Sequence, residues 1–210
     1  MIFFLQAPVF FYALFLQKSA VLVDELEALE TPEWAANAIL KREILTRRIV
    51  DPNCGTGVLA EAARRAGYDV IANDIFDWGY ALQNFTHDFL SPAADHHFGR
   101  LIKDQTVFMN PPFKKTIDFV KKAKKLGARK VVVYQNIAWY ASRGRREFWK
   151  KYRPSRIYLL ADRGTCWRVD VPERKRKGTT TKIFAFFVFD GWTDHDPILH
   201  LIYKDGGAGC

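Results

Sequence analysis

The sequence predicts an α/β protein with a mostly parallel, twisted sheet, helices on both of its faces and an antiparallel last strand. Short apolar runs alternate with amphipathic segments along most of the chain, which is the pattern of strands connected by crossover helices. Only a polar loop separates the last two apolar runs, so we expect these two strands to pair antiparallel. With 210 residues, the chain is long enough for one hydrophobic core but too short for two large domains.

Each element follows from its local residues. Thr31, Pro32 and Glu33 predict the start of a helix, with Thr31 as the N-cap and Pro32 at the first helical position. Apolar residues then recur at helical spacing up to Leu45. The other elements are predicted, in chain order, as a strand over 48–51, a helix over 58–66, strands over 69–75 and 105–109, a helix over 114–126, a strand over 130–134, a helix over 145–152 and strands over 156–160 and 183–189.

These elements predict a single domain over residues 31–192, preceded by an apolar extension (1–30) and followed by a tail (193–210). The first sixteen residues are almost wholly apolar, but no basic residue precedes this run, and Gln6 and Pro8 interrupt it. A secretory signal would need the basic residues, and a membrane span would need about 20 apolar residues in succession. We therefore expect a buried or poorly ordered extension, with a membrane-surface anchor as the alternative.

Charge is unevenly distributed along the chain. The net charge is +9, yet residues 1–100 hold 8 basic and 13 acidic side chains, whereas residues 101–210 hold 24 basic and 10 acidic ones. A strongly basic half indicates a polyanionic partner such as a nucleic acid. The alternative is a solvated surface that is rich in lysine.

The cysteines and histidines predict neither a disulfide framework nor a metal site. The three cysteines are an odd number without paired spacing, and His96 and His97 have no acidic or thiol partner at ligand spacing. Free thiols are typical of a reducing cytoplasm. We therefore expect a cytoplasmic protein that binds no metal.

A glycine-rich turn follows the strand predicted over 48–51. Gly55 and Gly57 allow a tight turn and a close approach of the backbone to a ligand. Asp74, at the end of the next strand, is placed to accept hydrogen bonds from a ribose diol. The glycine spacing also fits a dinucleotide site, but the carboxylate of Asp51 disfavours a pyrophosphate and suits a cationic sulfonium amino acid.

The sequence Asn110-Pro111-Pro112-Phe113 follows the strand predicted over 105–109. The two prolines stiffen the backbone and remove two N–H donors, which leaves a surface rich in acceptors. The side-chain oxygen of Asn110 and the carbonyl of Pro111 can each accept one hydrogen of a planar amino group, and Phe113 offers a flat platform for its ring. The alternative is that these residues only form a turn.

Together these segments resemble class I S-adenosylmethionine-dependent methyltransferases, which have a Rossmann-like fold, and among them the N6-adenine DNA methyltransferases with an Asn-Pro-Pro-Phe motif. The resemblance covers roughly residues 31–189. It implies S-adenosylmethionine as the cofactor and in-line methyl transfer to an exocyclic amino nitrogen, most plausibly adenine N6 in DNA. The cofactor-binding residues that it implies are Thr31, Pro32, Asp51, Cys54, Gly55, Gly57, Asp74 and Asp88, and the catalytic residues are Asn110, Pro111, Pro112 and Phe113.

A basic loop over 163–182 is predicted to contact nucleic-acid phosphates, with Trp167 available for stacking. Its alternative is a solvated hairpin loop. The predicted phosphate-contacting residues are Arg174, Lys175, Arg176 and Lys177, with Arg143 and Arg145 extending the same surface.

Other substrates remain open at the level of the sequence. An RNA methyltransferase acting on adenine N6 or guanine N2 is the nearest alternative to the DNA enzyme, because the same motif serves both polymers. A protein glutamine methyltransferase and a non-catalytic nucleic-acid-binding module are the others. Because the sheet uses most of the chain after Phe113, we expect no separate target-recognition domain and only short or relaxed sequence specificity.

Overall fold

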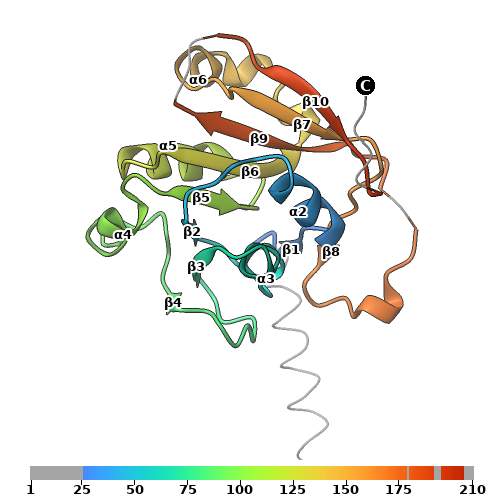
Figure 1. Cartoon of the computed structure of the whole chain (residues 1–210), viewed down its shortest axis with the longest axis horizontal. Helices are drawn as coiled ribbons and strands as arrows, with labels where there is room; N and C mark the ends of the chain where they lie inside the picture. The colour runs from blue at the N-terminus through green and yellow to red at the C-terminus, as the bar shows by residue number, and fades with distance from the viewer. Residues whose placement is uncertain (1–25, 179, 192–194, 206–210) are drawn as a thin grey trace, which may run out of the picture.

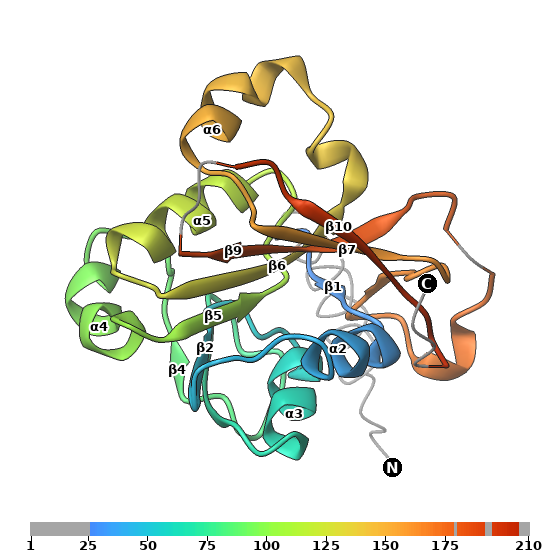
Figure 2. The same ribbon diagram turned by 45° about the horizontal axis from the view of Figure 1, so that its top comes forward.

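The structure is a computed structural model that describes residues 26–178, 180–191 and 195–205. The predictions for the apolar run over 1–16 and for Cys210 lie outside the described residues. Within the described part of the chain, an eight-stranded sheet has the order β10-β7-β9-β6-β5-β2-β3-β4 (Figures 1 and 2). A separate antiparallel ribbon pairs β1 with β8. The sheet therefore forms the centre of the molecule.

The strands of the large sheet share one direction, except for β9. β9 lies between β6 and β7 and is antiparallel to both. This confirms the antiparallel pairing expected for the apolar runs over 156–160 and 183–189, because their connection contains no crossover helix. The strand bounds are β1 Leu29–Glu30, β2 Arg48–Asp51, β3 Asp69–Asp74, β4 Phe85–Thr86, β5 Thr106–Met109, β6 Lys130–Asn136, β7 Arg156–Leu160, β8 Trp167–Arg168, β9 Phe184–Asp190 and β10 Ile198–Ile202.

Helices cover both faces of this sheet, as predicted. α2 and α3 pack on one face, and α4, α5 and α6 pack on the other. The strands serve both layers because successive side chains of a strand point to opposite faces. In β6, for example, Val132 packs with the α2–α3 layer, whereas Val131 and Val133 pack with the opposite layer. The helix bounds are α2 Glu33–Leu40, α3 Val58–Arg65, α4 Ala94–Ile102, α5 Thr116–Lys125 and α6 Arg146–Lys151, with short 3₁₀ helices η1 Ile137–Trp139, η2 Arg143–Arg145 and η3 Glu173–Lys175.

The start of α2 differs from the prediction. Pro32, not Thr31, is the N-cap residue, with an extended ψ of 131°. Its carbonyl accepts hydrogen bonds from the N–H groups of Ala35 and Ala36 at 3.0 and 3.2 Å, so the helix begins at Glu33. It ends at Leu40 rather than near Leu45, because the chain then turns toward β2. Thr31 is thereby left outside the helix.

The elements β1, β4, α4, β8 and β10 were not predicted. α4 begins with residues that favour helices weakly, including Asp95 and two histidines, and it is stabilised by burial of Phe98 and Ile102 against the sheet. β10 lies in the segment that was predicted to be a tail, where it extends the sheet by pairing in parallel with β7. The sheet thus continues past the predicted domain boundary at residue 192, and β1 lies before the predicted boundary at residue 31.

A buried ionic cluster ties the connection between α2 and β2 to the sheet. The Glu43 carboxylate accepts hydrogen bonds from Arg156 Nε at 2.5 Å, Tyr158 Oη at 2.7 Å and Lys130 Nζ at 2.9 Å. Lys130 begins β6 and Arg156 begins β7, so this cluster lies at the amino ends of these strands. The polar loops that follow β2, β3 and β5 lie at the opposite, carboxyl ends of the parallel strands. None of the helices in the described residues has the length and the apolar character that crossing a membrane requires.

Candidate active site

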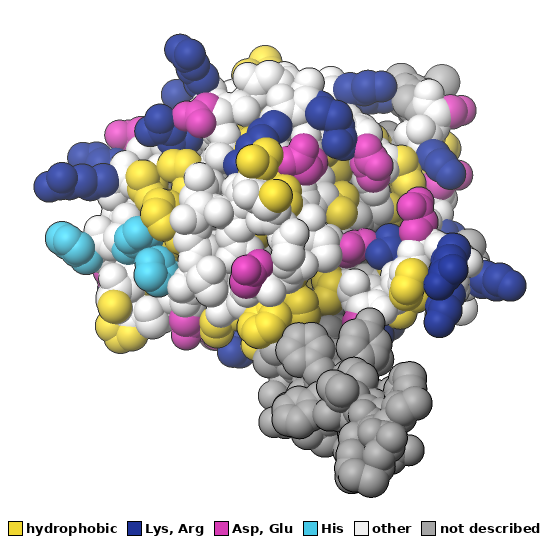
Figure 3. All heavy atoms as spheres, turned by 90° about the horizontal axis from the view of Figure 1, so that it is seen from below, with side chains coloured by type: hydrophobic (Ala, Val, Ile, Leu, Met, Phe, Trp, Pro, Cys, Tyr) yellow, Lys and Arg dark blue, Asp and Glu magenta, His cyan; other side chains and the backbone are white. Residues whose placement is uncertain are grey.

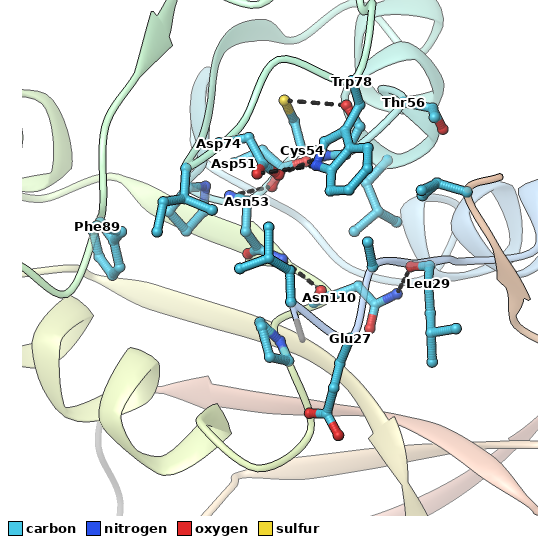
Figure 4. A pocket seen from close by; sticks show the side chains of 18 of the residues that line it. Glu27, Leu29, Asp51, Asn53, Cys54, Thr56, Asp74, Trp78, Phe89 and Asn110 are labelled. Carbon is cyan, nitrogen blue, oxygen red and sulfur yellow. Dashed lines mark hydrogen bonds between the residues drawn. The ribbon is translucent and has the colours of Figure 1, made fainter. Parts of the chain in front are cut away.

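A pocket opens at the carboxyl ends of β2, β3 and β5 (Figure 4). After β2 the chain continues to β3 on one side of β2, and it later returns to β5 on the other side. Ligands of open α/β sheets bind at such a reversal of strand order. The predicted site residues that line this pocket are Thr31, Asp51, Cys54, Gly55, Asp74, Asp88, Asn110 and Pro112.

The glycine turn forms one wall of this pocket. The Asp51 carboxylate is 1% exposed, and its Oδ1 accepts a hydrogen bond from the Asn53 N–H at 3.2 Å. Asp51 Oδ2 is buried and has no hydrogen-bond partner among the described residues. Gly55 has a φ of 54°, and a Cβ added to it would meet no atom within 4 Å. A ligand can therefore approach the backbone here.

Gly57 acts through the shape of the turn rather than by lining the pocket. Its φ is 92°, and a Cβ at this position would lie 2.4 Å from the ring of Tyr80. Only glycine combines this left-handed conformation with the close aromatic neighbour.

Asp74, at the end of β3, stabilises the glycine turn through hydrogen bonds. Its Oδ2 accepts a hydrogen bond from the Gly55 N–H at 2.8 Å, and its Oδ1 accepts from the Phe76 N–H at 3.1 Å and Trp78 Nε1 at 3.2 Å. Burial raises the pKa of Asp74. Burial, with the neighbouring charge of Asp74, also raises the pKa of Asp51 well above its ordinary value. Two buried carboxyl groups in one pocket favour a ligand that carries positive charge.

Cys54 lies at the bottom of the same turn and is buried. Burial and the nearby Asp51 and Asp74 raise the pKa of its thiol far above the ordinary cysteine range. A nucleophilic cysteine needs the opposite shift. Cys54 therefore contributes packing to this pocket.

Asn110 lies on the opposite wall, immediately after β5. Its side-chain Nδ2 donates a hydrogen bond to the carbonyl of Leu29 at 2.8 Å, and its own carbonyl accepts one from Asn53 Nδ2 at 2.5 Å (Figure 4). Asn53 belongs to the glycine turn, so the two predicted motifs are directly connected. Because the amide nitrogen is held, the orientation of the Asn110 side chain is fixed.

The rest of this motif surrounds the pocket edge. Pro112 lines the pocket, whereas Pro111 is buried and is not among the lining residues. The ring of Phe113 is half-buried and lies 5.8 Å from that of Phe184, outside the pocket lining. Gln135 Nε2, at the end of β6, donates to the Phe113 carbonyl at 3.4 Å and to Thr116 Oγ1 at 2.7 Å. This contact joins β6 to the motif.

The segment Leu26–Glu30 completes the pocket and was not predicted to take part in it. Glu27 Oε2 accepts a hydrogen bond from the Lys114 N–H at 3.1 Å. Glu30 Oε1 accepts from Thr56 Oγ1 at 2.5 Å, and its Oε2 pairs with Arg176. The sequence offered no signal for this segment, since it follows a long apolar run without a motif of its own.

Several solved structures have a fold similar to that of this chain. No family model and no curated protein matches the chain. The methyltransferase subunit of a type I restriction-modification system from Streptococcus thermophilus has 10% identity and a TM-score of 0.58, over 83% of this chain and 46% of that chain. The M protein of the type I restriction enzyme EcoKI has 12% identity and a TM-score of 0.51, over 84% of this chain and 48% of that chain. A protein from Pyrococcus horikoshii that is assigned as an RNA methyltransferase has 17% identity and a TM-score of 0.52, over 81% of this chain and 95% of that chain.

The fold is that of a class I methyltransferase. The chain spans about half the length of the restriction-modification subunits that it matches. S-adenosylmethionine is the cofactor expected in such a fold, and the residues of the pocket fit it. Asp51 Oδ2 and Thr31 Oγ1 are buried acceptors without a partner among the described residues, and the space beside Gly55 is open. Asp88 lines the far end of the pocket, where it is exposed and its Oδ1 accepts from the Leu90 N–H at 2.9 Å.

The predicted basic residues lie outside this pocket of the methyltransferase fold. Arg174, Lys175 and Lys177 are exposed on the loop that follows β8. Figure 3 shows Lys and Arg side chains at several places around the outline of the face seen from below. Arg176 differs from them, because its guanidinium is half-buried and pairs with Glu30. Its contact with phosphate stays a prediction. Arg143 is exposed at η2, and Arg145 donates to the Trp139 carbonyl at 3.2 Å.

Across the described residues, the structure has no group of three or more His, Cys, Asp or Glu side chains that could hold a metal ion. His97 packs edge-on against the rings of Phe85 and His87, at 4.3 and 4.6 Å. His97 belongs to α4 and is partly covered there, where it faces Phe85 of β4.

Proposed function

We propose that this chain is an S-adenosylmethionine-dependent N-methyltransferase that acts on adenine N6 in DNA. One observation carries the proposal. Asn110 lines the same pocket as Asp51, Gly55 and Asp74, so an amine bound by Asn110 would face a cofactor bound by the glycine turn. The methyltransferase fold supports the same conclusion.

The cofactor would supply a methyl group on a positively charged sulfur. Asp51 and Asp74 would complement the positive charge of this ligand and accept hydrogen bonds from it, at a site where burial strengthens both interactions. Gly55 leaves room for the ligand beside the backbone. Thr31 and Asp88 would bind its two ends.

Asn110 and Pro111 would bind the acceptor amine. Since Asn110 Nδ2 is held by Leu29, its Oδ1 remains to accept one amine hydrogen, and the Pro111 carbonyl would accept the other. An amine conjugated to a base ring is a weak nucleophile because its lone pair is delocalised. Two fixed acceptors favour the pyramidal, nucleophilic form through electrostatic preorganisation. Phe113 would stack the target base at the pocket edge, after the base has left the duplex at a cost of a few kcal/mol.

DNA is favoured as the substrate by the basic second half of the chain. The similarity of the fold to two methyltransferase subunits of restriction-modification systems also favours DNA. RNA is the second candidate, and one observation favours it specifically. The P. horikoshii protein, assigned as an RNA methyltransferase, matches over 95% of its length, whereas the restriction-modification subunits match over less than half of theirs.

Parallel methylation assays test the proposal. Purified protein is incubated with S-adenosylmethionine labelled in the methyl group and with unmethylated genomic DNA, total RNA or a whole-cell protein extract. We expect label in DNA, and N6-methyl-2′-deoxyadenosine as the modified nucleoside in its digest. Label confined to RNA or to protein would refute the DNA assignment, and cofactor binding without any transfer would refute the enzyme.

Asn110→Ala is the matched variant for these assays. It should abolish transfer while the affinity for S-adenosylhomocysteine, measured by calorimetry, changes less than about threefold, since Asn110 is assigned to the acceptor rather than to the cofactor. Loss of cofactor binding together with transfer would contradict this division of roles.

A further inference from the structure

A second concave surface lies on the segment between β6 and β7. It is open to solvent and is lined by Tyr140, Ser142, Arg143, Arg146, Trp149, Lys150, Arg153 and Asp196. We call it the α6 groove. Figure 2 shows the segment that carries α6 projecting above β9 and β10. The groove thus lies on a projecting part of the molecule and is separate from the cofactor pocket.

The α6 groove combines cations with aromatic rings. Arg143, Arg146 and Lys150 are exposed, whereas Tyr140 and Trp149 are half-buried with their rings 4.9 Å apart. Trp149 Nε1 is shielded from solvent and has no hydrogen-bond partner among the described residues. A buried donor without an acceptor favours a ligand that supplies one.

The acidic side chains of the groove oppose this charge only weakly. Arg153 pairs with Asp196 at 3.7 Å, and Lys150 pairs with Glu147 at 2.7 Å. Asp196 and Glu147 have side chains that are 92% and 80% exposed, and exposed pairs contribute little free energy. Such pairs can be exchanged for contacts with phosphate oxygens.

The chain links the start of the groove to the end of β6. Gln135 contacts the Phe113 carbonyl at 3.4 Å, and the chain reaches Tyr140 five residues later through η1. From Tyr140 the groove runs along α6 to Arg153 and Asp196.

We propose that the α6 groove binds the single-stranded nucleic acid that flanks the target base. The cations would contact its phosphates, and Tyr140 and Trp149 would contact unpaired bases, which is the combination that single-strand-binding surfaces use. Duplex DNA offers phosphates to such a surface but keeps its bases stacked. The inference rests on the proposed function in one respect, namely that the substrate is a nucleic acid.

The test measures binding without methyl transfer. The full chain is titrated with a fluorescein-labelled oligo(dT), which contains no adenine, and with a duplex of equal length, by anisotropy at several salt concentrations. The variant Arg143→Ala/Arg146→Ala should bind the single strand at least about tenfold more weakly, and the slope of log K against log salt should fall by about 1.4, from two lost phosphate contacts. Its duplex affinity should change less.

Lys121→Ala/Arg129→Ala is the matched control, because it removes the same charge from two exposed residues at α5 and before β6. It should leave single-strand binding within about twofold of the parent. Equal losses in the two double variants would overturn the groove as a specific site. Losses that are equal for single strand and duplex would overturn its preference for unpaired bases.

Tryptophan fluorescence tests the aromatic part. Oligo(dT) should quench the parent protein, and Trp149→Phe should remove much of this quenching while the far-ultraviolet dichroism stays unchanged. Unchanged quenching in a folded Trp149→Phe variant would refute base contact at this residue. Methylation of nucleic acid that is lost in Asn110→Ala but unaffected by the groove variant would leave the proposed function standing and refute the groove alone.

Discussion

The side chain of Asn110 donates a hydrogen bond to the carbonyl of Leu29, which lies 81 residues earlier in the chain. The neighbour of Leu29, Glu30, contacts both Thr56 in the glycine turn and Arg176 after β8. One short segment thus contacts the motif assigned to the acceptor, the turn assigned to the cofactor and the basic loop. Its conformation therefore affects all three.

Glu30→Ala should weaken binding of S-adenosylhomocysteine by about tenfold, since it releases the Thr56 hydroxyl and leaves the half-buried Arg176 without its partner. Calorimetric titration measures the effect. Arg176→Ala removes the ion pair but leaves the Glu30–Thr56 hydrogen bond, so it should weaken binding less. Equal effects of the two variants would show that Glu30 does not support the glycine turn.

Binding of S-adenosylmethionine should strengthen as pH rises. Burial raises the pKa values of Asp51 and Asp74, so these groups lose their protons at a higher pH than exposed carboxyl groups, and the pocket becomes more negative as pH rises. The cationic cofactor should gain more affinity from this ionisation than S-adenosylhomocysteine, whose sulfur is neutral. The ratio of the two affinities, measured from pH 5 to 9, should rise by about tenfold, or about 1.4 kcal/mol. Asp51→Asn should flatten the rise.

Gly57→Ala should destabilise the fold by more than Gly67→Ala. Both glycines have a positive φ, 92° and 91°, which costs an L-residue about 1–2 kcal/mol. A Cβ at Gly57 would also overlap the Tyr80 ring, whereas one at Gly67 would meet no atom within 4 Å. Overpacking adds about 1–3 kcal/mol. Urea unfolding of both variants measures the difference, and equal losses would show that Tyr80 moves aside freely.

Glu43→Ala should cost about 3 kcal/mol, the lower end of the range for breaking a buried ion pair, because it leaves Lys130 and Arg156 with Asp190 as their remaining carboxylate partner. Glu33→Ala is the control. It removes an exposed pair with Arg65, in which both side chains are more than half exposed, and should cost less than about 1 kcal/mol. Thermal unfolding compares the two variants.

The same glutamate predicts a loss of stability in acid. Burial raises the pKa of Glu43, but hydrogen bonds from Arg156, Tyr158 and Lys130 outweigh burial and hold this pKa below the ordinary value of 4.5. A carboxyl group with a lowered pKa in the folded state stabilises the protein above its unfolded pKa, and this contribution is lost as pH falls through the folded pKa. The free energy of unfolding should therefore fall below about pH 4.5, and less steeply in Glu43→Ala. Parallel pH profiles would contradict this.

Much of the sheet could be predicted because its strands carry their own signal. β2, β5, β6 and β9 are buried on both faces, so each reads as a continuous apolar run. The glycine turn and the Asn110 motif could also be predicted, since glycine and proline have distinctive local backbone conformations. The structure places both motifs in one pocket because parallel strands end at a common edge.

The remaining parts depend on contacts distant in sequence. β1 has two residues and exists through its pairing with β8, so no local pattern marks it. β10 shows an apolar run, but its pairing with β7 depends on the order of the strands. Because β9 lies between β6 and β7, the other side of β7 is left for β10. The ion pair of Arg176 likewise depends on Glu30, a residue distant in sequence. The run of basic residues around Arg176 does not predict this partner.

The pairing of Leu29 with Arg168 has a consequence for synthesis of the protein. All the residues of the glycine turn and of the Asn110 motif leave the ribosome before Arg168, so a nascent chain can form the Asn110–Leu29 and Thr56–Glu30 contacts while β1 still lacks its partner strand. The backbone pairing of this wall is completed only when Arg168 has emerged.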